Sequence, residues 1–117
     1  METLLIVGIG GALGSMARYQ LSRLQALYGL PMGTLVVNIT GSFFITLLVA
    51  IKVSADWYAF AGIGVLGGYT TFSTFGFETF RMIENGDYLT AIANITANVA
   101  LSLLAAYAGL KIAGLIM

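Results

Sequence analysis

Two sets of uncharged polar side chains recur every four residues inside otherwise apolar stretches. The first set is Thr34, Asn38, Ser42 and Thr46, and the second is Thr90, Asn94, Asn98 and Ser102. A spacing of four places side chains on one face of an α-helix, so each set predicts a polar stripe. Small polar groups also join membrane helices, and for any single residue that packing role is favoured. Two parallel stripes without a charge favour a path for a polar solute instead.

The second notable feature is segment 62–78, which is rich in glycine and hydroxyl residues. Gly costs about 1 kcal/mol in a helix interior, and Ser and Thr compete for backbone hydrogen bonds, so we predict a helix broken mid-span. The freed carbonyl oxygens suit a cation such as Na⁺, and the freed N–H groups suit an anion. Close helix packing through small residues is the alternative. Packing explains the glycines but not Phe72 and Phe75, which flank Ser73 and Thr74.

The elements that must carry these residues are membrane spans. Of the 117 residues, 59% are hydrophobic and 9% are charged, whereas a soluble domain carries about 25% charged residues. Apolar runs cover residues 4–24, 33–51, 57–83 and 88–117. A spanning helix needs about 20 apolar residues, so we expect a single four-helix transmembrane domain over residues 1–117, with no extramembrane domain.

Charge and residue content exclude several classes of function. The formal net charge is zero, which leaves no basic patch for nucleic acid. The chain has no Cys and no His, the side chains most used for nucleophilic catalysis, proton transfer and metal binding. No carboxylate pair is evident either, so an enzyme is the least supported class.

Basic residues give little bias to the orientation in the membrane. With four spans, Lys52 and Lys111 fall on one side, and Arg18, Arg23 and Arg81 fall on the other. Two against three predicts a chain that inserts both ways up and forms an antiparallel homodimer. The plainer alternative is that one orientation wins by a small margin.

Three motifs together resemble the small fluoride ion channel family, Fluc, also called CrcB. They are residues 10–19 (GGALGSMARY), 33–42 (GTLVVNITGS) and 67–78 (GGYTTFSTFGFE), and they follow the family's order and spacing. The resemblance implies a passive channel in the cell (inner) membrane that exports fluoride from the cytoplasm. It also implies an antiparallel dual-topology homodimer with two pores, and a structural Na⁺ at the dimer centre.

The resemblance also implies roles for single residues. Carbonyl oxygens of Gly67 and Thr70 from both subunits would hold the Na⁺, and Arg18 would lie near the pore entrance. The family's pore asparagine and pore phenylalanines match Asn38, Phe72 and Phe75. Further positions for the polar path are Ser73, Thr74, Asn94, Asn98 and Ser102. Some family members carry a pore-facing Tyr on the fourth helix, where this chain has the two asparagines.

Two other classes of membrane protein compete with a channel. A small multidrug-resistance-type, proton-coupled antiporter has similar length and topology, but it needs an ionisable carboxylate inside the membrane. The first span has none after Glu2, and Glu78 lies toward the end of the third run. A purely structural membrane subunit would need neither the polar stripes nor a broken helix.

Overall fold

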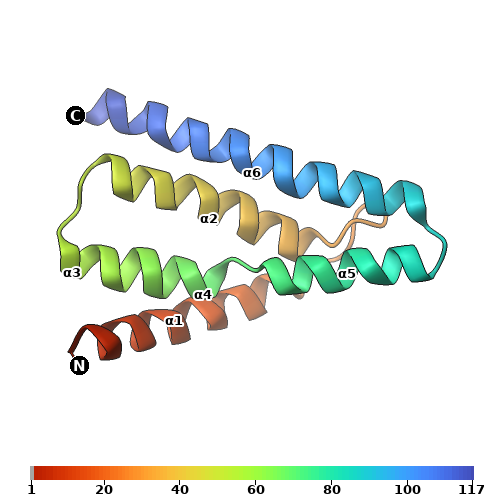
Figure 1. The fold of residues 1–117 in the computed structure, drawn as a ribbon, viewed down its shortest axis with the longest axis horizontal. Helices are drawn as coiled ribbons and strands as arrows, with labels where there is room; N and C mark the ends of the chain where they lie inside the picture. Colours follow the sequence, from red (N-terminus) through yellow and green to blue (C-terminus); the bar gives the residue numbers. More distant parts are fainter. Residues whose placement is uncertain (1) are drawn as a thin grey trace.

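The computed structural model describes residues 2–117, which form helices joined by short loops (Figure 1). The elements are α1 (Glu2–Leu21), α2 (Met32–Ala50), α3 (Ala55–Trp57), the π-helix η1 (Tyr58–Leu66), α4 (Gly67–Tyr69), α5 (Phe72–Glu84) and α6 (Tyr88–Ile116). Because α3, η1 and α4 follow one another without a gap, they form one continuous helical segment. Together with α5 this segment makes the third of four passes along the molecule, as the apolar runs predict.

The helices α1, α2 and α6 are each long and apolar enough to cross a membrane. Each is at least 19 residues long, which corresponds to about 28 Å or more of helix at about 1.5 Å per residue. The third pass is assembled from α3, η1, α4 and α5 instead, so its length is shared between two helical segments.

Turn chemistry explains where the helices end. After α1, Leu27 and Leu30 exchange two backbone hydrogen bonds around Tyr28 and Gly29, whose φ angles are 55° and 79°. Pro31 then precedes the first turn of α2, a place where its missing N–H costs nothing. Before α6, the positive φ of Gly86 turns the chain, and the Asp87 side chain caps the helix by accepting from Thr90 N.

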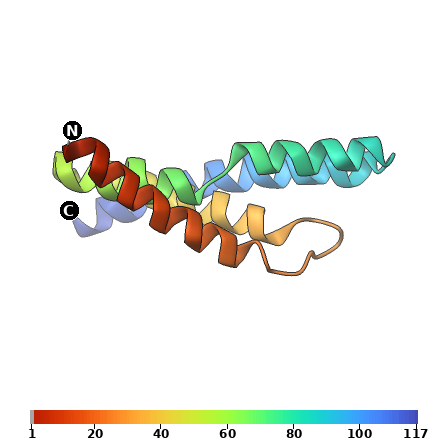
Figure 2. The same ribbon diagram turned by 90° about the horizontal axis from the view of Figure 1, so that it is seen from below.

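The four passes form a flat bundle that measures 47 × 33 × 19 Å. In Figure 1, α6 lies along α2, and α1 lies along the segment that contains η1 and α4. Figure 2 shows that α5 continues past the end of α1, with α6 as its main neighbour. Both termini lie at the same end of the bundle, as an even number of passes requires.

Glycines bring α1 into close contact with the third pass. A Cβ at Gly10 would meet the carbonyl oxygen of Phe60, and one at Gly14 would meet that of Val65. Gly10 and Gly14 therefore form a close-packing pair, at which the lack of a side chain lets two helices approach each other. The contact fixes the position of α1, along its helix axis, relative to the end of α4.

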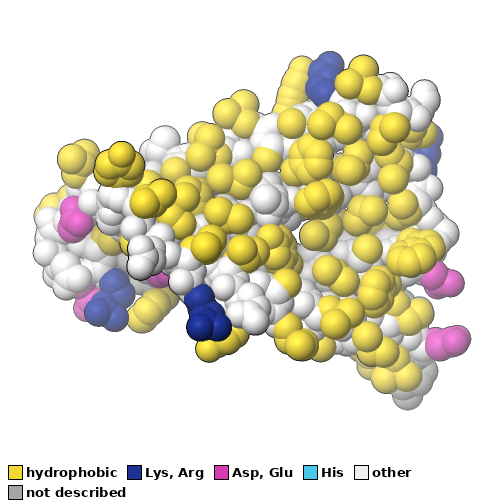
Figure 3. All heavy atoms as spheres, turned by 180° about the vertical axis from the view of Figure 1, so that it is seen from behind, with side chains coloured by type: hydrophobic (Ala, Val, Ile, Leu, Met, Phe, Trp, Pro, Cys, Tyr) yellow, Lys and Arg dark blue, Asp and Glu magenta, His cyan; other side chains and the backbone are white. Residues whose placement is uncertain are grey.

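The outer surface is mainly hydrophobic. Figure 3 shows a face of hydrophobic side chains with charged groups toward its margins. Large side chains such as Leu4, Leu103 and Leu115 are more than 60% exposed. A soluble domain does not leave so many large apolar side chains in water, so this surface suits contact with lipid or with other apolar protein surfaces.

Candidate functional site

The helical third pass is interrupted between α4 and α5. Thr70 has φ and ψ of −84° and 158°, and Thr71 has −150° and 121°, so both residues are extended. Thr70 still closes the preceding segment, because its N–H and its hydroxyl both donate to the carbonyl oxygen of Leu66. An interruption of this kind leaves polar backbone groups that need partners from elsewhere.

Other helices supply several of those partners. From α2, Asn38 accepts from the Thr71 N–H at 2.9 Å and donates to the Thr71 carbonyl oxygen at 3.1 Å. From α1, Arg18 Nε donates to the Gly68 carbonyl oxygen at 3.1 Å. Within the third pass, the Thr71 hydroxyl accepts from Thr74 N at 3.1 Å and so caps α5. The sequence therefore holds the interruption open with specific side chains.

A chain of amide hydrogen bonds runs from the interruption into the bundle. The second hydrogen of Asn38 Nδ2 goes to Asn98 Oδ1 at 3.0 Å, and Asn98 Nδ2 donates to the carbonyl and side-chain oxygens of Asn94. Asn94 Nδ2 donates to the Thr79 hydroxyl at 2.9 Å, and that hydroxyl donates to the Phe75 carbonyl oxygen. Because an amide nitrogen has two hydrogens, those of Asn38 and Asn98 are fully used.

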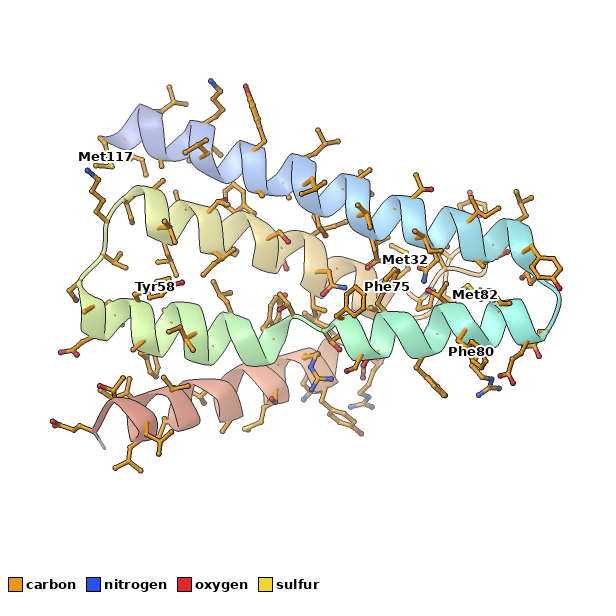
Figure 4. All side chains as sticks on the ribbon, viewed as in Figure 1. Met32, Tyr58, Phe75, Phe80, Met82 and Met117 are labelled. Atoms are coloured by element: carbon orange, nitrogen blue, oxygen red, sulfur yellow. The ribbon has the colours of Figure 1, made fainter. Side chains whose placement is uncertain are left out.

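A hollow of about 260 Å³ lies beside this chain of amides. Ser102 on α6 lines it, and its hydroxyl oxygen is buried without a hydrogen-bond partner among residues 2–117. Phe75 points inward from α5, whereas the neighbouring Phe80 points away (Figure 4). The complete lining is Asn38, Thr70, Thr71, Phe72, Phe75, Asn98, Val99 and Ser102, and none of these side chains is charged.

The two phenylalanines of the hollow differ in exposure. Phe75 is 8% exposed and Phe72 is 82% exposed. Their rings lie 5.5 Å apart at 65°, which is an edge-to-face arrangement. Phe72 therefore continues the hollow out to the surface of the single chain.

A second hollow, of about 200 Å³, lies on another side of the interruption and is lined in part by Gly67, Thr70 and Ser42. Within residues 2–117 there is no group of three or more His, Cys, Asp or Glu side chains that could hold a metal ion. Any cation held in this hollow would need backbone or hydroxyl oxygens as ligands.

The structure distributes the residues of the two predicted stripes among several environments. Asn38, Asn94, Asn98 and Ser102 gather beside the interruption, whereas Ser42 lines the second hollow. The Thr46 hydroxyl donates to the Ala106 carbonyl oxygen at 2.7 Å and so joins α2 to α6. Thr74 supplies its N–H to the cap of α5, and Ser73 is exposed with its hydroxyl 3.3 Å from that of Thr71.

Two residues of this site were not singled out by sequence reasoning. Thr79 ends the chain of amides, and its position four residues after Phe75 on α5 is the signal that could have found it. Thr71 caps α5, and a hydroxyl residue directly before a helix start is a common capping pattern.

The chain is similar to one known protein family and to several named proteins. Residues 5–110 match the family model described as CrcB-like protein, Camphor Resistance (CrcB). A protein of Pyrococcus abyssi, named "Fluoride-specific ion channel FluC", is 40% identical over 119 residues, which cover 97% of each chain. A protein of Caulobacter sp. (strain K31) with the same name is 47% identical, covering 97% of this chain and 95% of its own. One of Rhizobium meliloti is 44% identical, with 96% of each chain covered.

The apolar helices, the lipid-compatible surface and the polar groups inside the bundle define a multi-pass helical membrane protein. The names of its relatives are those of ion channels rather than of enzymes. The chain belongs to the CrcB-like protein family, as its three motifs predict.

Proposed function

We propose that this chain is a fluoride-selective channel whose ion path includes the uncharged hollow beside the interruption. The observation that carries the proposal is the Ser102 hydroxyl, which is buried without a partner in the wall of that hollow. Relatives at 40–47% identity are named as fluoride-specific ion channels, and they cover nearly the whole chain.

The lining of the hollow suits a small anion. Fluoride gives up water only if other donors replace it, and Ser and Thr hydroxyls can donate. The edges of phenyl rings are electropositive, so the rings of Phe72 and Phe75 would offer favourable contacts to an anion. Conduction needs sites that bind weakly enough to release the ion, which favours such groups over a Lys or Arg in the path. Passive flow of this kind would carry fluoride out of a cytoplasm that has accumulated it.

The functional unit of the proposal is an antiparallel homodimer with two pores. A single chain leaves Phe72 and Phe80 on α5 82% and 58% exposed, and α6 is the main neighbour of this helix. A second copy would cover the open side of α5 and complete the wall at Phe72. Each copy brings one hollow, so two copies give two pores, and the near-even basic count permits opposite orientations.

A structural Na⁺ is part of the same proposal. Gly67 and Thr70 line the second hollow, and their carbonyl oxygens have no helical partner, since Thr71 N and Thr74 N bond elsewhere. Carbonyl oxygens are hard ligands that suit a small cation, so the residues fit the ion. The same residues from two subunits would supply enough ligands at the dimer centre. The bound ion would add positive potential close to the anion path.

Fluoride efflux from liposomes tests the function. Liposomes that contain the purified protein and potassium fluoride are diluted into fluoride-free buffer with a potassium ionophore, and a fluoride electrode records the release. We expect release far faster than from protein-free liposomes. Equal release from the two preparations would overturn the proposal.

Proton-coupled antiport is the second candidate, because Glu78 Oε1 is buried and has no hydrogen-bond partner in the part of the chain that the structure describes. The same liposomes distinguish the two mechanisms when an imposed pH gradient opposes the fluoride gradient. A channel lets fluoride run down its own electrochemical gradient, whereas a coupled antiporter drives a solute uphill at the expense of the proton gradient. Uphill fluoride accumulation that Glu78→Gln abolishes would replace the channel with the antiporter.

A further inference from the structure

Two backbone N–H groups at the interruption bond to other acceptors than they would in a continuous helix. In an α-helix each N–H donates to the carbonyl four residues earlier. Thr71 N would therefore donate to Gly67 O, and Thr74 N would donate to Thr70 O. Both donors bond elsewhere: Thr71 N to Asn38 Oδ1 at 2.9 Å, and Thr74 N to the Thr71 hydroxyl at 3.1 Å.

The two carbonyls that lose these partners are those assigned to Na⁺ in the proposed function. Gly68 O, which lies between them, receives Arg18 Nε at 3.1 Å and is thereby occupied. The side chains around the interruption thus bind the carbonyl oxygen of Gly68 and leave those of Gly67 and Thr70 available to a cation. The available pair, Gly67 and Thr70, lines the same hollow of about 200 Å³.

We infer that Asn38 and Thr71 are positioning residues for the cation site: their side-chain oxygens divert the Thr71 and Thr74 N–H groups and so free the Gly67 and Thr70 carbonyl oxygens. This inference rests on the proposed Na⁺ site and adds a role for Asn38 beyond lining the anion path. Asn38 therefore links the two ions, because it also lines the hollow proposed for fluoride.

The hydrogen-bond inventory of Asn38 supports this role. Its oxygen accepts from Thr71 N, and its two amide hydrogens go to Thr71 O and Asn98 Oδ1. Its described bonds thus leave no amide hydrogen free for an anion. Two of the three bonds hold one peptide unit at the interruption, which is the task of a positioning residue.

The dependence of stability on Na⁺ concentration tests the inference without relying on ion flux. A ligand that binds only the folded state stabilises it by RT ln(1 + [Na⁺]/Kd), so fitting the rise in unfolding temperature yields the Na⁺ concentration at half-occupancy, here called the Na⁺ midpoint. The full-length protein in detergent is titrated with sodium chloride against N-methyl-D-glucamine chloride at constant ionic strength. We expect the unfolding temperature of the wild type to rise steadily with Na⁺ once the Na⁺ concentration exceeds that midpoint.

Variants at Thr71 give the sharper comparison. Thr71→Val keeps the shape but loses the hydroxyl, so Thr74 N–H can return to Thr70 O, and we expect the Na⁺ midpoint to rise about tenfold. Thr71→Ser keeps the hydroxyl and should retain the wild-type midpoint to within about twofold. A valine variant with the midpoint of the serine variant would overturn the role of Thr71.

Substitutions of Asn38 distinguish its effect on Na⁺ binding from its effect on fluoride. Asn38→Asp keeps an oxygen for the Thr71 N–H and adds a negative charge that attracts a cation, so we expect a Na⁺ midpoint no higher than that of the wild type. Asn38→Leu loses the acceptor, and we expect a midpoint at least about tenfold higher. Equal midpoints for the two folded variants would overturn the role of Asn38. If Asn38→Leu does not fold, the Thr71 pair decides the inference as a whole.

Thr46→Val is the control for general loss of stability. It removes the bond from Thr46 to the Ala106 carbonyl oxygen, which also joins α2 to another helix but lies away from the interruption. We expect a lower unfolding temperature at every Na⁺ concentration with an unchanged midpoint. A shift as large as that of Thr71→Val would show that the midpoint reports stability alone. A wild type without any Na⁺ response would instead overturn the Na⁺ site of the proposed function, and the inference with it.

Discussion

Ser102 differs from its amide neighbours in one respect, which is that its hydroxyl has no hydrogen-bond partner although it is buried. Asn38 and Asn98 use both of their amide hydrogens within the protein. A buried donor without a partner is costly, so it points to a group that is bound there in the working protein. We assign that place to the permeating anion.

Ser102→Ala tests this assignment. The substitution removes one hydroxyl and leaves the other lining residues intact, so the protein should still fold. A hydrogen bond to a charged group contributes about 1.5–3 kcal/mol, so we expect fluoride efflux from liposomes to fall by about tenfold or more. Unchanged efflux would remove Ser102 from the path. Ser22→Ala is a suitable control, because the Ser22 hydroxyl bonds only to the local Tyr19 carbonyl oxygen.

Two further substitutions test the lining at the residue scale. Asn38→Asp places a carboxylate beside the hollow, which repels an anion, and Phe75→Ile removes a positive ring edge while keeping bulk. We expect each to reduce fluoride efflux by at least about tenfold, on the scale of one lost interaction with a charged group. Size-exclusion chromatography should show that both variants keep the assembly of the wild type. Wild-type efflux in both would return these residues to a packing role.

The contact of α1 with the third pass sets the position of the interruption. Gly14 lies where a Cβ would meet the Val65 carbonyl oxygen, whereas Gly8 on the same helix has nothing within 4 Å of such an atom. Arg18, one helical turn beyond Gly14, donates to Gly68 O. The glycine contact therefore determines whether Arg18 reaches the end of α4.

Gly14→Ala and Gly8→Ala form a matched pair. Overpacking at Gly14 should destabilise the protein by about 1–3 kcal/mol, since the obstacle is backbone. Alanine at Gly8 should leave stability unchanged or raise it by up to about 1 kcal/mol through helix propensity. Unfolding temperatures in detergent measure both. Equal effects of the two variants would show that the α1 contact is looser than described.

Much of the helical arrangement could be predicted from the sequence. The apolar runs located the helices, because that signal is local along the chain. The chain of amides could not be predicted in the same way. Its bonds join Asn38, Asn98 and Thr79 across three helices, and they depend on how those helices rotate. The stripe rule also grouped Thr46 with Asn38, although Thr46 bonds to α6 away from the interruption.

The open side of α5 and the exposed Phe72 favour an antiparallel pair of chains as the assembly. Single cysteines placed at Asn85 and at Val53, in loops at opposite ends of the bundle, test this arrangement by labelling with a membrane-impermeant reagent in intact cells. An antiparallel dimer exposes each position on both sides of the membrane, so about half of either cysteine should be labelled from outside, as equal insertion of the two orientations requires. Full labelling of one position with none of the other would establish a single orientation.

The ratio of fluoride to chloride efflux tests whether the uncharged hollow beside the interruption carries fluoride. Chloride is larger and more weakly hydrated, so a narrow path lined by hydroxyls and ring edges should exclude it, whereas a loose aqueous pore would pass both ions. Liposomes loaded with both salts, with each ion followed by its own electrode, give the two rates in one preparation. We expect fluoride to leave at least about a hundredfold faster than chloride, equivalent to about 2.7 kcal/mol of discrimination. Comparable rates for the two anions would show that this hollow is not a fluoride-selective path.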